Sequence, residues 1–223
     1  MKIAIDGTAA SGKGTLARGL ATRLGYDYLD TGLLYRAVAL EASRLGITSI
    51  YDNIKEQPPK GVIKKSTIIK LTSIALGLSL PISDSPDLRN QKISSLAANV
   101  ASLPDIRVAL TQKQRSFAHS PPSNSGVILD GRDIGSVILP KADFKFFIDA
   151  KPEIRAKRRF AELKHAKSNQ TQQAILKDLN ERDKIDSTRQ IAPLKRHSDA
   201  FFIDSSSLNA DEVLQIALNY ING

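Results

Sequence analysis

Short apolar runs alternate with segments of helical periodicity along most of this 223-residue chain. The runs predict five strands, at residues 3–5, 26–30, 127–130, 144–149 and 200–204. Between them, apolar residues recur three or four positions apart, as at Leu16, Leu20 and Leu24. Strands that alternate with helices favour an α/β fold, in which helices flank five parallel strands.

Residues 62–82 interrupt this alternation. The segment 66–72 is rich in β-branched residues, and Leu76, Leu78, Leu80 and Ile82 alternate with smaller residues. This pattern predicts two or three short antiparallel strands, which form a β-rich insert in the core. Two helices are expected next, at about 88–102 and 105–118.

The composition is that of a globular protein, with 41% hydrophobic and 25% charged residues. No apolar stretch is long enough to cross a membrane, and Met1 and Lys2 leave no room for a signal peptide before the first strand. The chain has no cysteine, so we expect a cytoplasmic protein without disulfides. The net charge of +9 suggests an anionic partner, either a nucleic acid or a small substrate with several phosphates.

A glycine-rich sequence between the first strand and the first helix predicts a phosphate-binding P-loop. Its backbone N–H groups and the start of the helix would hold an anion. Lys13 would follow a β- or γ-phosphate during transfer. Gly14 occupies the position where this motif usually has Ser or Thr, a form typical of nucleoside monophosphate kinases. An ordinary glycine-rich turn is the alternative. The predicted nucleotide-binding residues are Gly7, Thr8, Ala9, Ala10, Ser11, Gly12, Lys13, Gly14 and Thr15.

Two further motifs follow predicted strand ends, where open α/β sheets bind ligands. In the first, Asp30 would orient Mg²⁺ through water, while Thr31, which would also cap the next helix, and Arg36 would reach a phosphate. In the second, Asp130 resembles an acid of the Mg²⁺ shell, and Arg132–Asp133 places a phosphate clamp beside a base or sugar acceptor. A capped helix and a turn with a local ion pair are the alternatives.

Two helical segments carry clustered arginines. Arg182, Asp186 and Arg189 share one helix face, as a site for phosphate and ribose requires. Arg155, Arg158 and Arg159 span one turn before a polar segment, and are expected to close as a lid over the β- and γ-phosphates. A solvated basic helix is the alternative for each.

With these motifs together, the chain resembles the bacterial cytidylate kinases over essentially its full length. The resemblance is carried by the P-loop, by Asp130-Gly131-Arg132-Asp133-Ile134-Gly135, by the Arg182, Asp186 and Arg189 spacing, and by Ala192-Pro193-Leu194. It departs from that family at Ala9 and Ala98, where serines are usual.

The resemblance implies a P-loop nucleoside monophosphate kinase of one domain that transfers the ATP γ-phosphate to CMP or dCMP. The core would comprise residues 1–36, 119–154 and 172–223, with a substrate-binding insert at about 37–118 and a lid at about 155–171. Arg107 and Asp133 would read the cytosine edge, since the 4-amino group is a donor. The resemblance also implies that the acceptor phosphate is held by Arg36, Arg132 and Arg189, and that its sugar is contacted by Arg182 and Asp186. The implied catalytic residues are Lys13, Arg132, Arg155, Arg158 and Arg159. The residues implied to hold Mg²⁺ are Thr15, Asp30 and Asp130.

Three other functions remain possible at this stage. A related P-loop kinase would use UMP, AMP or a small metabolite as its acceptor. A nucleic-acid-binding module would use the +9 charge but leave the P-loop unexplained. A nucleotide-dependent switch would have no reason for arginines on the acceptor side. We expect a monomer that uses ATP and Mg²⁺ and binds neither nucleic acid nor membrane.

Overall fold

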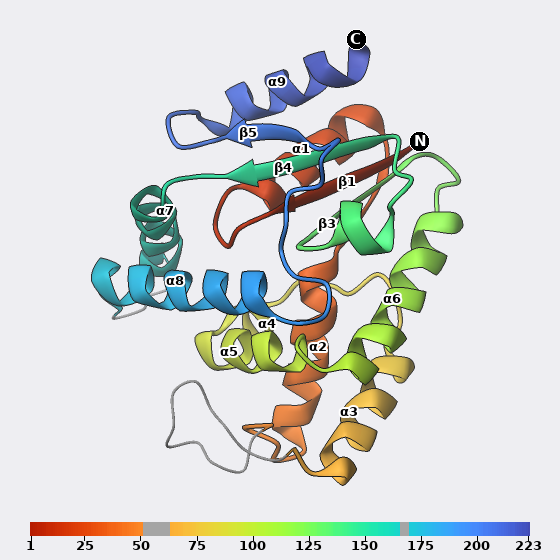
Figure 1. Ribbon diagram of the computed structural model, residues 1–223, viewed down its shortest axis with the longest axis vertical. Helices are drawn as coiled ribbons and strands as arrows, with labels where there is room; N and C mark the ends of the chain where they lie inside the picture. The colour runs from red at the N-terminus through yellow and green to blue at the C-terminus, as the bar shows by residue number, and fades with distance from the viewer. Residues whose placement is uncertain (51–62, 166–169) are drawn as a thin grey trace. The chain divides into compact units, whose positions relative to one another are not determined.

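The computed structural model describes residues 1–50, 63–165 and 170–223. Five strands form one sheet in the order β2-β3-β1-β4-β5. Figure 1 labels β3, β1, β4 and β5. Their bounds are β1 Lys2–Gly7, β2 Asp27–Asp30, β3 Val127–Gly131, β4 Phe144–Asp149 and β5 Phe201–Asp204. Strand β1 pairs in parallel with β3 and β4, and β4 pairs in parallel with β5. The predicted five-stranded α/β sheet is confirmed.

The chain divides into two compact units, which we describe separately. Unit 1 comprises residues 1–29 and 118–223, and unit 2 comprises residues 30–117. The helices of unit 1 are α1 (Lys13–Leu24), α7 (Pro152–His165), α8 (Gln172–Thr188) and α9 (Ala210–Asn222), with a short π-helix η1 (Ile134–Ile138). The helices of unit 2 are α2 (Thr31–Arg44), α3 (Lys65–Gly77), α4 (Pro86–Arg89), α5 (Gln91–Val100) and α6 (Pro104–His119), the last of which ends in unit 1.

One hydrophobic core in unit 1 joins the sheet to α1 and α9. Ile3, Ile5 and Phe146 of the central strands pack with Leu20 of α1 and Val213 of α9. Helix α9 begins at the predicted capping box, in which Asn209 and Glu212 each accept a hydrogen bond from the other's backbone N–H. A smaller cluster joins α7 and α8 to the P-loop, because Ala9 packs against residues of both helices.

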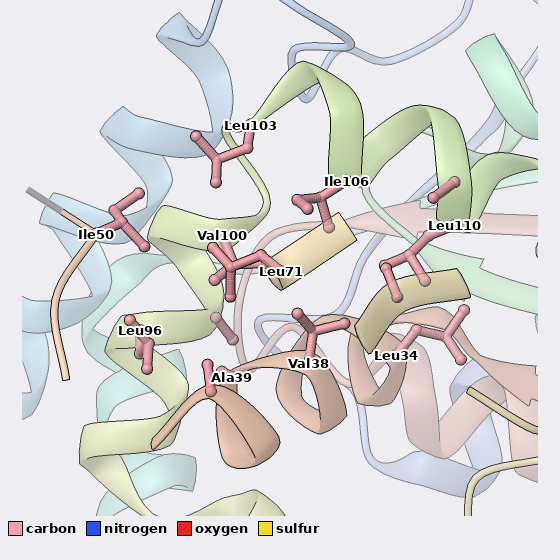
Figure 2. Packing of buried hydrophobic residues seen from close by; sticks show 14 of the residues in the cluster. Leu34, Val38, Ala39, Ile50, Leu71, Leu96, Val100, Leu103, Ile106 and Leu110 are labelled. Carbon is pink, nitrogen blue, oxygen red and sulfur yellow. The ribbon is translucent and has the colours of Figure 1, made fainter. Parts of the chain in front are cut away.

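The core of unit 2 is made mainly by helices and contains no strand, among the residues that the structure describes. Val38 of α2, Leu71 of α3, Val100 of α5 and Leu110 of α6 lie in one buried cluster (Figure 2). Burying one such side chain contributes about 1.5–3 kcal/mol to stability. The same layer includes Ile50, close to the end of the described segment.

The predicted β-rich insert is wrong. Residues 65–77 form helix α3, and no strand lies between residues 31 and 126 in the described part of the chain. The buried residues of α3 are Leu71 and Ala75, four positions apart on one helix face. Packing of that face overrides the β-propensity of the branched residues at 67–69. The apparent alternation at Leu76–Ile82 spans the end of α3 and an irregular segment.

Part of the predicted lid lies outside the described residues. Its first portion, 155–165, belongs to α7, and residues 166–169 are not described. The helices expected at 88–102 and 105–118 correspond to α4, α5 and α6. Thr31 is the first residue of α2, whereas Asp30 occupies the N-cap position. The prediction that Thr31 caps this helix is therefore wrong.

Candidate active site

The P-loop connects the end of β1 to the start of α1. Gly7 is required there by close approach, since a Cβ atom would lie 2.1 Å from the carbonyl oxygen of Ile148 on β4. Gly12 adopts the left-handed conformation, with φ 93°, and directly precedes α1. The loop is held by a hydrogen bond from Ser11 Oγ to the carbonyl of Thr8, at 3.0 Å. This geometry suits an anion at the positive end of α1.

Lys13 and Thr8 connect the loop to its surroundings. Lys13 Nζ donates to the Thr8 carbonyl at 3.3 Å. Thr8 Oγ1 donates to Asp149 Oδ1 on β4 at 2.6 Å. The first turn of α1 has no acidic residue, so nothing there opposes the binding of a negatively charged ligand.

Asp130 lies beside the P-loop at the end of β3. A Cβ atom on Gly14 would lie 3.4 Å from Asp130 Oδ2, and Tyr28 donates to Asp130 Oδ1 at 3.0 Å. Asp130 is buried, whereas Thr15 is exposed in the first turn of α1. Among the residues that the structure describes, no group of three or more His, Cys, Asp or Glu side chains is placed to hold a metal ion. Asp130 alone fits a cation that takes most of its ligands from phosphates and water.

Two predicted motifs of unit 1 meet in one buried ion-pair network. Arg132 Nε lies 2.7 Å from Asp186 Oδ2 of α8. Arg189 follows α8 and pairs with Asp186 and with Asp133, at 3.6 Å each. Arg189 Nε also donates to the carbonyl of Ala192 at 2.7 Å, and Ala192 has a left-handed φ of 51°. Residues of the two motifs therefore lie together in one ion-pair network.

The network is electrostatically unusual because three guanidinium groups surround Asp186. Burial alone would raise the pKa of Asp186, but Arg132, Arg182 and Arg189 hold it below its ordinary value. Burial likewise opposes the charge of Arg132, yet Asp186 keeps the pKa of Arg132 raised. The pKa of Arg182 is lowered by burial and by the neighbouring Arg132. The Nε atom of Arg182 is buried without a hydrogen-bond partner.

The three predicted lid arginines of α7 have different surroundings. Arg155 is buried, pairs with Asp183 of α8 at 2.6 Å and donates to the Ala9 carbonyl at 3.1 Å. Arg158 donates to Ser205 and to the carbonyl of Leu208, in the loop before α9. Arg159 pairs with Glu162 one turn later, at 2.9 Å. Arg155 thus contacts the P-loop and Arg158 contacts a different loop, while Arg159 pairs within α7 and its side chain is 21% exposed.

The predicted site residues of unit 2 lie on α2 and α6. Arg36 donates to Ser94 Oγ of α5 at 2.7 Å and to the Leu88 carbonyl at 2.8 Å. Arg107 is buried, donates to the carbonyl of Ala101 and lies over the Tyr35 ring at 5.7 Å. Thr31 is buried at the start of α2.

Asp30, predicted to orient Mg²⁺, belongs to this unit and lies 3.6 Å from the Arg89 guanidinium. Arg89 itself makes a bidentate contact with Asp84. Asp30 therefore has a cationic neighbour within unit 2, which would compete with a directly bound metal ion.

Two further acidic residues, to which no sequence motif assigned a role, lie at this site. Asp6, at the end of β1, accepts hydrogen bonds from the backbone N–H groups of Ile134 and Gly135. Asp183 pairs with Arg155, and its Oδ1 atom lies 3.5 Å from the Ala9 backbone nitrogen. An ionisable residue directly after a buried apolar run was the available signal for Asp6. Asp183 had none, because its neighbours Arg182 and Asp186 define the recognisable spacing.

The comparisons with known proteins agree on one family. The family model described as cytidylate kinase matches residues 3–223. A cytidylate kinase of Paramagnetospirillum magneticum is 42% identical over 98% of this chain and 96% of that protein. One of Azorhizobium caulinodans is also 42% identical, with the same coverage. A solved structure of an uncharacterized protein from Eubacterium ventriosum covers 100% of this chain and 99% of that one with a TM-score of 0.57. At 13% identity it indicates a shared fold alone.

Proposed function

The chain belongs to the cytidylate kinase family, and we propose that it transfers the γ-phosphate of ATP to CMP or dCMP, which gives CDP or dCDP. One observation carries the proposal beyond family membership. The unit that contains the P-loop also gathers Arg132, Arg182 and Arg189, each partly buried, around the buried Asp186. Guanidinium groups clustered in this way suit a phosphate ligand, since each presents a fork of N–H donors.

The donor nucleotide is assigned to the P-loop, residues 7–15. The backbone and the start of α1 would hold the phosphates, and Lys13 would move from the Thr8 carbonyl to the γ-phosphate. Mg²⁺, when bound, neutralises phosphate charge. Asp130, beside Gly14, is the residue best placed to hold it through water, with Thr15 and Asp30 as further candidates.

The acceptor nucleotide is assigned to the arginines and carboxylates that the family resemblance singles out. In unit 1, Arg132 and Arg189 would hold its phosphate, and Arg182 and Asp186 its sugar. The orphaned Nε atom of Arg182 supports this, because a buried donor without a partner is costly unless a ligand satisfies it. In unit 2, Arg36 and Thr31 would contact the phosphate. Arg107 and Asp133 would read the cytosine edge.

The chemical step needs no covalent enzyme intermediate. A phosphate oxygen of CMP attacks the γ-phosphorus in line, while the bond from that phosphorus to the β–γ bridging oxygen breaks and ADP leaves. Lys13, Arg132 and the arginines of α7 would stabilise the negative charge on the transferred group. Their contribution depends on their position in the closed site, which excludes water.

An acceptor panel tests the proposal. ADP release from ATP and Mg²⁺ is measured with CMP, dCMP, UMP, AMP, GMP and dTMP offered separately. Rapid turnover with CMP and dCMP, and little with the others, is the expected result. Equal turnover with UMP would retain the mechanism but contradict the base assignment. Tight ATP binding without turnover on any acceptor would favour a nucleotide-dependent switch and reject the kinase.

We also propose that the enzyme acts as a monomer in the cytoplasm, where its substrates are available. All the residues assigned above come from a single chain. In the described part of the chain, no helix combines the length and the hydropathy of a membrane span. Light scattering with and without nucleotides measures the oligomeric state directly, and a mass near 24.3 kDa is expected.

A further inference from the structure

Asp6 connects the two loops of unit 1 to which the nucleotides are assigned. Its carboxylate accepts a hydrogen bond from the backbone N–H of Ile134 and another from Gly135, both at 2.8 Å. Gly7, the first residue of the P-loop, follows Asp6 directly. Ile134 directly follows the Arg132–Asp133 pair. The buried Asp6 side chain, directly before the P-loop, thus binds the backbone of the loop that contains Arg132 and Asp133.

The surroundings of this carboxylate are fitted to that contact. Asp6 is 6% exposed, and burial raises its pKa to about 6 despite the two hydrogen bonds. A Cβ atom at Gly135 would lie 3.4 Å from Asp6 Oδ2 and 3.2 Å from Lys145 Cδ. A side chain at 135 would therefore press on the Lys145 stem, which would have to shift by a few tenths of an ångström beside the carboxylate. A buried charge is retained at a cost in stability, which indicates a role other than packing.

The register of the sheet explains why an additional contact is needed. Asp6 lies opposite Gly131 at the end of the β1–β3 ladder. Beyond this pair the strands separate, and the Arg132–Asp133 segment leaves the sheet. The side chains of this segment pair with Asp186 and Arg189. The two backbone amides that follow the segment donate to the Asp6 carboxylate.

We propose that Asp6 is a positioning residue, whose carboxylate fixes the Arg132–Asp133 loop relative to the P-loop so that acceptor and donor are aligned. This inference depends on the proposed function, which assigns Arg132 and Asp133 to the acceptor. It predicts that loss of the carboxylate impairs the use of CMP while the P-loop still binds ATP. Positioning errors of this kind reduce rate and acceptor affinity together, since the reacting atoms must lie close and in line.

Asp6→Asn is the main test. The amide keeps the shape of the side chain, but its NH₂ group faces a backbone N–H, so one of the two hydrogen bonds is lost. We expect kcat/KM for CMP to fall about tenfold to a hundredfold, with KM for ATP changed less than about threefold. Hydrogen exchange at the Ile134 and Gly135 amides should become faster in the same variant.

Two further variants separate positioning from general damage. Ile3→Val lies on the same buried strand and removes one methyl group without touching the loop, so it should lower Tm yet keep KM for CMP. Gly135→Ala disturbs the same contact from the other side, and should reproduce the CMP defect if Asp6→Asn does not fold. The inference would be overturned by an unchanged KM for CMP in both loop variants or by equal increases in KM for ATP and for CMP. A higher KM for CMP in Ile3→Val would also overturn it. Failure of the wild-type enzyme to phosphorylate CMP would instead reject the proposed function, and unchanged exchange at 134–135 would then still count against Asp6.

Discussion

The Nε atom of Arg132 lies 2.7 Å from Oδ2 of Asp186, and the two side chains are 13% and 7% exposed. Arg189 approaches the other carboxylate oxygen, at 3.6 Å. In the absence of a ligand, Asp186 is therefore the principal counter-charge for the guanidinium groups around it. The acceptor phosphate would add negative charge where the protein has a local excess of positive charge.

Removing this counter-charge should destabilise the free enzyme. Asp186→Asn keeps the shape but leaves the guanidinium groups without their carboxylate, and we expect the free energy of unfolding to fall by about 3 kcal/mol. Urea unfolding near pH 7 measures it. The control is Asp211→Asn, in the exposed first turn of α9, with an effect of about 0.5 kcal/mol. If the free energy of unfolding falls no more than in the control, the ion pairs of Asp186 do not offset the cost of burying its charge.

Lys13 should act on the chemical step. Lys13→Met removes the charge assigned to the γ-phosphate, and we expect kcat to fall by at least about a hundredfold, the scale of a lost transition-state contact. The measurement is steady-state turnover with saturating ATP, Mg²⁺ and CMP. Lys177→Met, on an exposed position of α8, serves as the matched control. A Lys13→Met enzyme with near-normal kcat would reject this catalytic role.

Arg155 and Arg159, which lie one turn apart on α7, should respond differently to substitution. Arg155 is 4% exposed at its side chain and ties Asp183 to the P-loop carbonyl of Ala9. Arg155→Met should therefore lower the free energy of unfolding by about 3 kcal/mol, since it leaves Asp183 without its partner. The measurement is again urea unfolding, and little loss would place Arg155 among the ligand-binding groups alone.

Arg159 is paired with exposed Glu162, in a contact worth about 0.5 kcal/mol or less. Its guanidinium is therefore free to exchange this partner for a phosphate. Arg159→Ala should leave stability unchanged and lower kcat about tenfold or more if the arginine contacts the transferred group. Turnover equal to that of the wild type would remove Arg159 from the lid.

Asp133 offers a test of base recognition. A carboxylate accepts from the 4-amino group of cytosine, whereas an amide also donates, as the 4-oxo group of uracil requires. Asp133→Asn should therefore reduce the CMP-to-UMP ratio of kcat/KM by about tenfold or more. Arg189 remains 3.6 Å from this position, so its interaction with position 133 also weakens, and both acceptors lose some affinity. An unchanged ratio would show that Asp133 does not read the base.

The elements that the sequence predicted well are those whose signal is local. Strands β1 and β3 are continuous apolar runs, and the capping box at Asn209 specifies the start of α9 without help from distant residues. Helix α3 was mistaken for strands because five of its 13 residues are β-branched. Its helical state depends on Leu71 and Ala75, which pack against residues distant in sequence. Such tertiary packing is invisible to a reading of local propensity.

The site shows the same division. The spacing of Arg182, Asp186 and Arg189 predicted a shared helix face, which is right for Arg182 and Asp186 of α8 but wrong for Arg189, which follows the helix in an extended conformation. Arg132 pairs with Asp186. The contacts of Asp6 with residues 134 and 135 were not predictable, because they join segments more than 120 residues apart. The different surroundings of Arg155 and Arg158 likewise depend on which distant loop each side chain reaches. Sequence spacing identifies the members of a helix face, but not their partners.

Asp6 gives a pH dependence with a sign opposite to that of a paired surface carboxylate. Its pKa is about 6 in the folded protein, against an ordinary value of 3.8 that the unfolded chain would retain. Burial is the largest cause of this raised pKa, and the charge of Asp133 adds to it, whereas the backbone hydrogen bonds from Gly135 and Ile134 and the charge of Arg132 lower the pKa by less. The folded state therefore binds a proton more tightly than the unfolded state does. The contribution of Asp6 to stability is complete below pH 4 and is lost as the pH rises to 6.

The size of this effect follows from the shift of about two pH units, which corresponds to about 3 kcal/mol. Urea unfolding of the wild type and of Asp6→Asn between pH 4 and 7, at constant ionic strength, isolates it. The stability of the wild type relative to the variant should decline by at most about 1.4 kcal/mol per pH unit between pH 4 and 6, and should be constant above that range. Asp186, whose pKa is lowered, titrates alike in both proteins and cancels from the difference. Parallel curves would show that Asp6 stays ionised throughout, and that its two hydrogen bonds fully offset its burial.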